Sequence, residues 1–447
     1  MSDAYINVCA AVLLHEGKLL LTTRRPGGHL AGCWEFPGGK VNADETLEAC
    51  IVRELKEELA LFVNCAGELF SLAFDYPEKS IRLHFMLCEL NGASRPIPQE
   101  QQAFGWFTAS QAIALELASA DELALNKLRA CADGAAAMEG LNVALAADLL
   151  AFMKLRDPLE NAKMPDWLHI SVDGGKERMT VRELVKCGGL NTVCESAKCP
   201  NRCDCWKRKT ATFMILGDTC TRNCRFCAVK HGVPTAVDES EPERIARSVA
   251  DLGLKYAVLT CVTRDDLPDG GAGMMAATVA AIRKMTPETQ VEVLCSDYKG
   301  DFSCIEKVMA AGPVVYGHNV ETVERLTPAI RSRADYRRSL AVLKYAAEFG
   351  AKCGVVAKSG LMLGLGESDD EIRQTLKDLR EAGVEIVTLG QYLRPTRRNW
   401  PVQKLVTPDE FRAWQEYAEK ELGFRKAVAG PFVRSSYMAE EAFNKVE

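Results

Sequence analysis

Seven cysteines fall within a short stretch of the sequence, from Cys194 to Cys227. The last three, Cys220, Cys224 and Cys227, form a CxxxCxxC pattern, called here the CxxxCxxC set. Three closely spaced thiolates can hold three irons of a 4Fe–4S cube, which leaves the fourth iron open to chelate another molecule. A structural zinc site is the alternative, but it usually has four ligands and commonly uses CxxC pairs. The spacing therefore favours an iron–sulfur cluster.

A second three-cysteine set precedes the first. Cys194, Cys199 and Cys205 are separated by four and five residues, and we call them the upstream set. Two independent sets of this kind indicate two clusters. Cys203 lies between these spacings and is expected to be a spare thiol. Most of the other cysteines are scattered singly along the chain, which is typical of small buried hydrophobic residues.

Longer motifs around these cysteines resemble a known family. The CxxxCxxC set follows a predicted strand and resembles the signature of radical S-adenosylmethionine (SAM) enzymes. Over about residues 163–443 the chain resembles one branch of them, the lipoyl synthases. The matching motifs are VCESAKCPN at 193–201, CW at 205–206, TATFMILG at 210–217, RDDLPDGG at 264–271, GHN at 317–319, KSGLMLGLGE at 358–367, LGQYLRP at 389–395 and GPFVRSSY at 430–437.

This resemblance implies a fold and two cofactor sites. The fold would be a radical SAM partial (βα)6 TIM-like barrel of the α/β class. The CxxxCxxC set would bind the 4Fe–4S cluster that chelates SAM and generates a 5′-deoxyadenosyl radical. The upstream set would bind an auxiliary 4Fe–4S cluster, and Ser436 of the RSSY motif would be its fourth ligand. An oxygen ligand is harder than a thiolate, so its iron should be lost more easily.

The resemblance also implies a reaction and its partners. Lipoyl synthases insert two sulfur atoms, at C6 and C8 of an octanoyl chain on a carrier lysine, and the auxiliary cluster is the sulfur source. The implied partners are octanoylated lipoyl carrier domains or proteins, a reductant protein of the flavodoxin or ferredoxin type, and an iron–sulfur cluster donor. A biotin synthase-like sulfur insertase is the alternative, but the upstream set and the RSSY motif argue against it.

Other residues at predicted strand ends are candidates for binding SAM. They are Asn319, Gly270, Gly271, Gly364 and Gly366. Glycines at strand ends permit close backbone approach to a ligand, and we favour that role for these four over plain turns. His318 could be a core histidine. A basic group could receive an acidic carrier domain or could be a solvated face. It comprises Lys207, Arg208, Lys209, Arg394, Arg397 and Arg398.

A cluster of glutamates lies near the N-terminus. Glu54, Glu57 and Glu58 have i, i+3, i+4 spacing, so three carboxylates share one face of the helix predicted over 46–59. Clustered like charges suit Mg2+ bound to a diphosphate, whereas a solvated acidic face is the alternative. Together with Arg53 and the preceding WEFPGGK, the run resembles the Nudix box.

The Nudix resemblance implies catalysis by Arg53 and the three glutamates with Mg2+. It is strongest to the branch that hydrolyses oxidised nucleoside triphosphates such as 8-oxo-dGTP, so we expect a nucleoside diphosphate-linked substrate. A nucleotide-binding module without hydrolysis is the alternative. Ala60 stands where the family usually has glycine, and alanine is tolerated less well if the helix ends there in a left-handed conformation. Asp121 falls where relatives contact the base.

The elements that position these residues follow from hydrophobic periodicity. Strand-like and helical patterns alternate over residues 6–130, and βα units repeat from about residue 208, which predicts a parallel sheet, open or curved into a barrel. The strands predicted there are 211–216, 256–262, 290–294, 314–316, 352–358, 386–392 and 426–430. We predict an α+β Nudix domain over 1–130, an alanine-rich helical linker over 131–160 and a radical SAM domain over 161–447, with the auxiliary cluster segment at 190–207.

Composition limits the remaining possibilities. Hydrophobic residues make up 47% of the 447 residues and charged residues 26%, which is ordinary for a globular protein. The formal net charge of -6 does not favour nucleic acid as a partner. No apolar run approaches the length of a membrane span, and no secretory signal is visible at the N-terminus. We therefore expect a cytoplasmic protein that does not bind a membrane.

Overall fold

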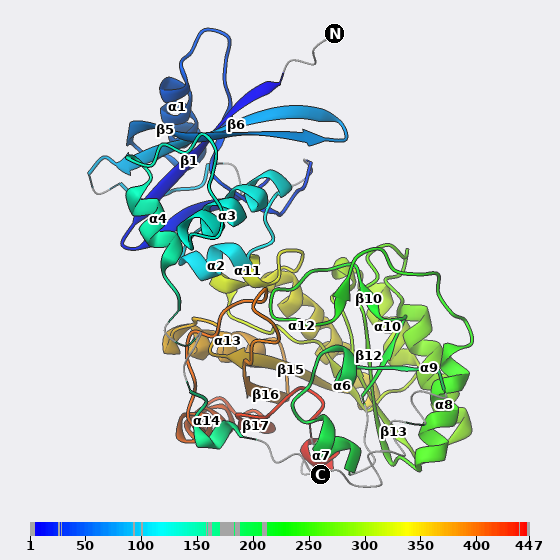
Figure 1. Cartoon of the computed structure of the whole chain (residues 1–447). Helices are drawn as coiled ribbons and strands as arrows, with labels where there is room; N and C mark the ends of the chain where they lie inside the picture. Colours follow the sequence, from blue (N-terminus) through cyan, green and yellow to red (C-terminus); the bar gives the residue numbers. More distant parts are fainter. Residues whose placement is uncertain are drawn as a thin grey trace. The chain divides into compact units, whose positions relative to one another are not determined.

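The structure is a computed structural model that describes residues 5–25, 27, 29–92, 94–99, 102–157, 159, 163–169, 183, 188–207, 212–437 and 439–444. The chain divides into two compact units, Met1–Glu160 (unit 1) and Asn161–Glu447 (unit 2). Figure 1 shows the whole chain coloured along the sequence. Each unit is described separately below.

Unit 1 is built on a seven-stranded sheet. Its strands run in the order β3-β2-β1-β6-β5, with β4 paired to β1 and β7 paired to β2. β1 and β6 are parallel, whereas β5 and β6 form a long antiparallel hairpin. The strand bounds are β1 Ile6–His15, β2 Lys18–Thr23, β3 Trp34–Glu35, β4 Gly38–Lys40, β5 Val63–Tyr76, β6 Lys79–Leu90 and β7 Phe104–Phe107.

Helix α1 (Leu47–Leu59) carries the predicted glutamate cluster and packs on this sheet. The hydroxyl of Thr46 accepts the backbone N–H of Ala49 and caps the N-terminus of the helix. Ile51 and Leu55 are fully buried in the core that the helix shares with β1 and β6. The helix predicted over residues 46–59 is therefore confirmed.

The described residues of unit 1 also form the helices α2 (Ala109–Ala114), α3 (Ser119–Ala132) and α4 (Ala147–Lys154). The last of these lies in the segment predicted as a linker. Leu149, Phe152 and Met153 of α4 are buried, and α4 packs against α3. This segment is therefore part of the compact body of unit 1, since apolar side chains on one face of α4 require a packing partner.

Unit 2 contains an eight-stranded sheet in the order β17-β16-β15-β14-β13-β12-β9-β8. The neighbours from β9 to β17 are all parallel, and β8 is antiparallel to β9. Among the described strands, pairing does not join β8 to β17. The bounds are β8 Asn191–Thr192, β9 Thr212–Ile215, β12 Tyr256–Cys261, β13 Gln290–Leu294, β14 Val315–Gly317, β15 Val356–Leu363, β16 Ile386–Gln391 and β17 Lys426–Gly430.

Helices follow successive strands, as the repeated βα pattern predicts (Figure 1). They are α8 Glu241–Leu252, α9 Ala272–Met285, α10 Phe302–Ala310, α11 Thr327–Ile330, α12 Tyr336–Cys353, α13 Asp369–Glu381 and α14 Pro408–Glu416. Shorter elements before and after them are α6 Val193–Ser196, α7 Arg202–Lys207, the paired β10 Thr219–Cys220 and β11 Lys230–His231, and α15 Ala439–Asn444. The predicted α/β fold with a radical SAM-type order of βα units is confirmed.

One predicted strand was placed too early in the sequence. The strand predicted over 352–358 begins only at Val356 and continues to Leu363, because α12 extends to Cys353 and ends at Gly354 in a left-handed conformation. Gly354 has a φ of 75°, which glycine adopts at little cost. The apolar run on both sides of this glycine hid the boundary between helix and strand.

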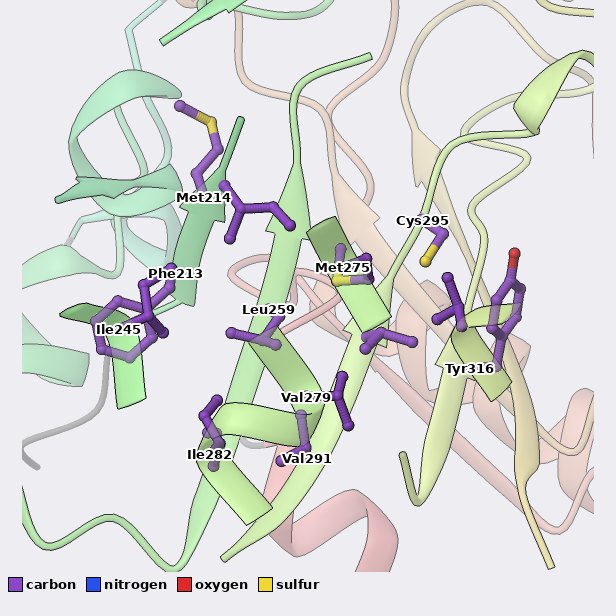
Figure 2. Close-up of a cluster of buried hydrophobic side chains, with 14 of the residues drawn as sticks. Phe213, Met214, Ile245, Leu259, Met275, Val279, Ile282, Val291, Cys295 and Tyr316 are labelled. Carbon is purple, nitrogen blue, oxygen red and sulfur yellow. The ribbon is translucent and has the colours of Figure 1, made fainter. Parts of the chain in front are cut away.

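The main core of unit 2 lies between the strands and the helices that cover them. Figure 2 shows side chains of β9, β12 and β13 packed against those of α8 and α9. The residues shown include Phe213, Ile245, Leu259, Met275, Val279, Ile282 and Val291. Because side chains alternate along a strand, Glu292 points to the opposite face, where its carboxylate lies 2.7 Å from the Lys358 ammonium. Tyr256 donates to the same carboxylate, also at 2.7 Å.

Candidate active sites

A cavity of about 540 Å³ lies in unit 2, at the carboxyl ends of the parallel strands. Both predicted cysteine sets line it, and so does Ser436. The residues involved are Cys194, Cys199, Cys205, Cys220, Cys224, Cys227 and Ser436. Parallel strands place their carboxyl ends at one edge, where such folds build active sites. The structure thus brings together seven predicted ligands that lie far apart in the sequence.

Backbone amides point at the sulfurs of the CxxxCxxC set. Cys220 Sγ accepts the N–H groups of Arg222 at 3.4 Å and Thr263 at 3.3 Å, and Cys227 Sγ accepts that of Val229 at 3.4 Å. Burial raises the pKa of Cys224 to about 11 and that of Cys227 to about 12. Such thiols need a cation or a metal to be held as thiolates, and amide donors suit the sulfurs of an iron–sulfur cluster.

Two polar contacts attach the segment around Ser436 to the segment that carries the upstream set. The side-chain amide of Asn201 donates to the carbonyl of Phe432 at 2.6 Å. The hydroxyl of Tyr437 donates to Asp204 at 3.2 Å. The C-terminal RSSY segment is thereby attached to the segment that carries Cys199 and Cys205. Arg208 and Lys209 of the predicted basic group, and the side chains of Cys203 and Lys207, lie outside the described residues.

Asn319 also lines the cavity, together with two charged residues that the sequence reasoning missed. Arg331 is only 8% exposed, and its Nη1 donates to the carbonyls of Asn319 and Val320. Its Nε is buried and has no hydrogen-bond partner among the described residues. Glu321 adopts a left-handed φ of 65°, and burial raises its pKa. A buried guanidinium with a spare donor fits an anionic ligand group such as a carboxylate.

The four predicted glycines lie elsewhere. Gly270, Gly271, Gly364 and Gly366 do not line the cavity; within the described residues, Gly360 and Gly390 do. All four have positive φ, and a Cβ on Gly271 would lie 2.2 Å from Leu216 Cδ1. Their need for glycine therefore comes from backbone turns and close packing. His318 is buried, with Nδ1 bonded to the carbonyl of Cys295 and Nε2 to the hydroxyl of Ser339, as expected of a core histidine.

In unit 1, Arg53 connects the predicted acidic cluster. Its guanidinium donates to Glu45 at 2.7 Å, Glu54 at 2.8 Å and Glu57 at 3.0 Å. Burial and the charge of Glu54 raise the pKa of Glu58 to about 7. In the described part of the chain, no three His, Cys, Asp or Glu side chains are arranged to hold a single metal ion. Arg53 neutralises part of the charge that a cation would otherwise balance.

Two further sequence expectations can be compared with unit 1. Ala60 ends α1 with a φ of 53°, so the condition under which alanine is tolerated less well than glycine is met. Asp121 is buried and accepts the backbone N–H of Phe36 at 3.1 Å. Burial raises the pKa of Asp121 to about 7 and that of nearby Glu35 to about 8. Unit 1 thus has two acids with raised pKa values at the WEFPGGK segment, one within it and one bonded to it.

Comparison with known proteins agrees with this geometry. Residues 214–379 match the family model described as Radical SAM superfamily, and residues 5–128 match the NUDIX domain. The lipoyl synthase of Caldicellulosiruptor saccharolyticus is 50% identical over 279 residues, which cover 62% of this chain and 97% of the relative. The chain belongs to the lipoyl synthase family. The biotin synthase-like alternative is thus not favoured.

Other relatives extend the same similarity. The lipoyl synthase of Pyrobaculum calidifontis is 51% identical over 285 residues, which cover 63% of this chain and 96% of the relative. The solution structure of the E. coli ORF135 protein has 32% identity and a TM-score of 0.27, and the match covers 31% of this chain and 97% of that one. Because residues 5–128 match the NUDIX family model, the chain carries an N-terminal Nudix domain in addition to its lipoyl synthase part, and both parts belong to enzyme families.

Membership of the radical SAM lipoyl synthases implies SAM and 4Fe–4S clusters as cofactors and octanoylated lipoyl carriers as substrates. The donor set in the cavity fits these cofactors, because it offers thiols for iron and a buried spare guanidinium donor for an anionic group. Among the described helices, none combines the length and the apolar character that crossing a bilayer requires.

Proposed function

We propose that the unit 2 cavity inserts two sulfur atoms, at C6 and C8 of a protein-bound octanoyl-lysine, to form lipoyl-lysine. The observation that carries this proposal is the convergence of the CxxxCxxC set, the upstream set and Ser436 on one cavity. A single shared cavity lets a substrate carbon activated at one cluster meet sulfur at the other without leaving the protein. Proximity of this kind can contribute a large part of the rate enhancement.

Several residues that line the cavity have a proposed part in this reaction. Cys220, Cys224 and Cys227 would hold a 4Fe–4S cluster, which would supply the electron for reductive cleavage of SAM to a 5′-deoxyadenosyl radical. Arg331 receives the carboxylate of SAM through its spare donor, and Asn319 orients a polar group of SAM. These contacts bind and orient SAM against the cluster that the three thiolates hold.

The upstream set has the second part. Cys194, Cys199 and Cys205 would hold the auxiliary cluster with Ser436 as its fourth ligand, and that cluster would supply the sulfur. The attachment of the RSSY segment through Asn201 supports this role, because it holds the serine near the thiols. A harder oxygen ligand favours iron release when sulfur is withdrawn.

Anaerobic reconstitution of the full chain tests this proposal. We expect about eight iron and eight sulfide per chain, conversion of octanoyl-lysine peptide to lipoyl-lysine, and formation of 5′-deoxyadenosine. The triple variant C194A/C199A/C205A should lose about half of the iron and all lipoyl formation but keep 5′-deoxyadenosine formation. C353A removes an exposed thiol outside the cavity and is the matched control. Four iron and no lipoylation in the unaltered chain would contradict the assignment.

The carrier substrate is proposed to dock beside the cavity mouth. Arg394 lines the cavity, while Arg397 and Arg398 on the same loop are exposed. This loop contacts the CxxxCxxC segment through Asn399, which donates to the carbonyl of Cys227 at 2.9 Å. An acidic carrier domain would complement these charges. R397E/R398E should weaken binding of the octanoylated carrier, whereas K420E should not, because Lys420 is an exposed lysine outside this loop and the cavity lining. Equal affinities would exclude this surface.

Two partner proteins and a location complete the proposal for unit 2. Reductive SAM cleavage needs an electron donor, and we propose a reductant of the flavodoxin or ferredoxin type. Loss of sulfur from the auxiliary cluster requires rebuilding by an iron–sulfur cluster donor. Both clusters are oxygen-sensitive cofactors that suit a reducing compartment, which agrees with the cytoplasmic location expected from the sequence.

Unit 1 is proposed to be a Mg2+-dependent pyrophosphohydrolase of a nucleoside diphosphate-linked substrate. Glu54, Glu57 and Glu58 would bind the cation, and Arg53 would orient Glu54 and Glu57, as its present contacts do. Pyrophosphate release from 8-oxo-dGTP with Mg2+ tests this, and E57Q should abolish it while K127Q should not. A nucleotide-binding module is the second candidate. It is supported by the contacts of Arg53 with three glutamates, because Arg53 neutralises part of the charge that would bind a cation. Nucleotide binding without pyrophosphate release would favour this candidate.

A further inference from the structure

Arg222 lies inside the CxxxCxxC set, between Cys220 and Cys224, and its side chain is almost fully buried. Its Nε donates to Asp265 at 2.8 Å, and its Nη2 donates to Asp265 at 2.9 Å and to Asp297 at 2.6 Å. Asp265 follows strand β12 and Asp297 follows strand β13. Two carboxylates from neighbouring strand ends therefore fix one cation within the cluster-binding loop.

The network continues beyond Arg222. Asp297 is 0% exposed, and its second oxygen accepts the Nε of Arg338 on α12 at 2.8 Å. Burial alone would raise the pKa of Asp297, but the hydrogen bond and charge of Arg222 outweigh it and hold that pKa well below its usual range. The four side chains thus carry two positive and two negative charges. Buried charges compensated in this way are costly to remove singly.

Arg222 also lies beside the three cysteines of the CxxxCxxC set. Its own backbone N–H donates to Cys220 Sγ at 3.4 Å, and its side chain lines the cavity with the three thiols. A positive charge held beside these sulfurs would stabilise an electron added to a cluster that the three thiols bind.

We propose that Arg222 is a positioning residue that fixes the cluster-binding loop and whose charge, opposed by Asp265, sets the reduction potential of the cluster held by the CxxxCxxC set. This inference rests on the proposed ligand assignment for that set. Net charge and hydrogen bonding around a cluster control its potential, so the two partners of one ion pair should act in opposite directions. A loop that merely lost its shape would not show that opposition.

The test uses the full chain with C194A/C199A/C205A, so that only one cluster is present, in redox titrations followed by electron paramagnetic resonance. R222Q should shift the potential to a more negative value, because a cation is lost. D265N should shift it to a more positive value, because an anion is lost. R222K keeps the charge and should stay close to the parent. R337Q is the control, since Arg337 is exposed on α12 and pairs with Glu324.

The results of these titrations distinguish an effect of charge on the reduction potential from a loss of the loop's structure. Opposite shifts in R222Q and D265N, with R337Q unchanged, support the proposal. Shifts of the same sign, or no shift in variants that carry their full iron, would overturn it. If R222Q binds no iron, R222K and D265N decide the question, because both keep a buried polar side chain. A separate variant tests whether Cys220, Cys224 and Cys227 are the cluster ligands. A C220A/C224A/C227A chain that retains about eight irons would refute that ligand assignment.

Discussion

Replacing Lys358 by methionine should strongly destabilise unit 2. Lys358 and Glu292 each have side chains only 3% exposed, and their charged atoms lie 2.7 Å apart. At an effective dielectric constant of about 20 the attraction at this distance is about 6 kcal/mol, part of which offsets the desolvation of both groups. Removing one partner of a buried pair leaves the other charge uncompensated and costs about 3–5 kcal/mol. We expect a loss in that range for K358M.

Hydrogen exchange of the full chain measures this loss where it occurs, because protection of the β13 and β15 amides reports their opening free energy. A loss of about 3–5 kcal/mol lowers protection there by about two to three and a half orders of magnitude. K420M removes an exposed partner of Glu416 and should change protection little. E292L/K358M should recover part of the loss, although Tyr256 then loses its acceptor. A K358M effect no larger than that of K420M would refute the reasoning.

Three further predictions concern pH, a helix end and a tight turn. Because burial raises the pKa of Glu58 to about 7 and of Glu35 to about 8, folded unit 1 binds these protons more tightly than the unfolded chain does. Without divalent cations its stability in urea should therefore fall as pH rises from about 5 to 8, and E58Q should flatten that slope; a profile independent of pH would contradict this. A60G should raise the unfolding free energy of unit 1 by about 1 kcal/mol, since Ala60 is left-handed; a lower melting temperature would exclude this. G271A should cost more than about 2 kcal/mol through its clash with Leu216, with partial recovery in L216A/G271A measured by thermal melting.

The sequence predicted the elements whose signals are local. Helix α1 has an apolar stripe and a Thr46 cap, and the βα units show periodic burial, so their positions follow from short segments. The thiols of both sets were predicted from spacing alone. Ser436, by contrast, was assigned only through family resemblance, because nothing in its neighbourhood distinguishes a ligand serine from a surface serine.

Residues whose role depends on distant partners were missed or misread. Arg331 looks like any arginine in the sequence, and only the structure shows that it is buried at the cavity with a spare donor. Glycine motifs mark turns as readily as ligand contacts, and packing against Leu216 accounts for Gly271. Long-range burial and backbone conformation cannot be read from spacing.

The bond between Asn201 and Phe432 and that between Tyr437 and Asp204 have a consequence for the order of events during synthesis. The upstream cysteines leave the ribosome more than 200 residues before the RSSY segment that attaches to them. Until that segment emerges, the cavity lacks one wall and the proposed auxiliary cluster site lacks Ser436. On the proposed assignment, the auxiliary cluster would be loaded after translation, and a chain interrupted shortly before residue 430 would keep most of its sheet yet lack the proposed serine ligand.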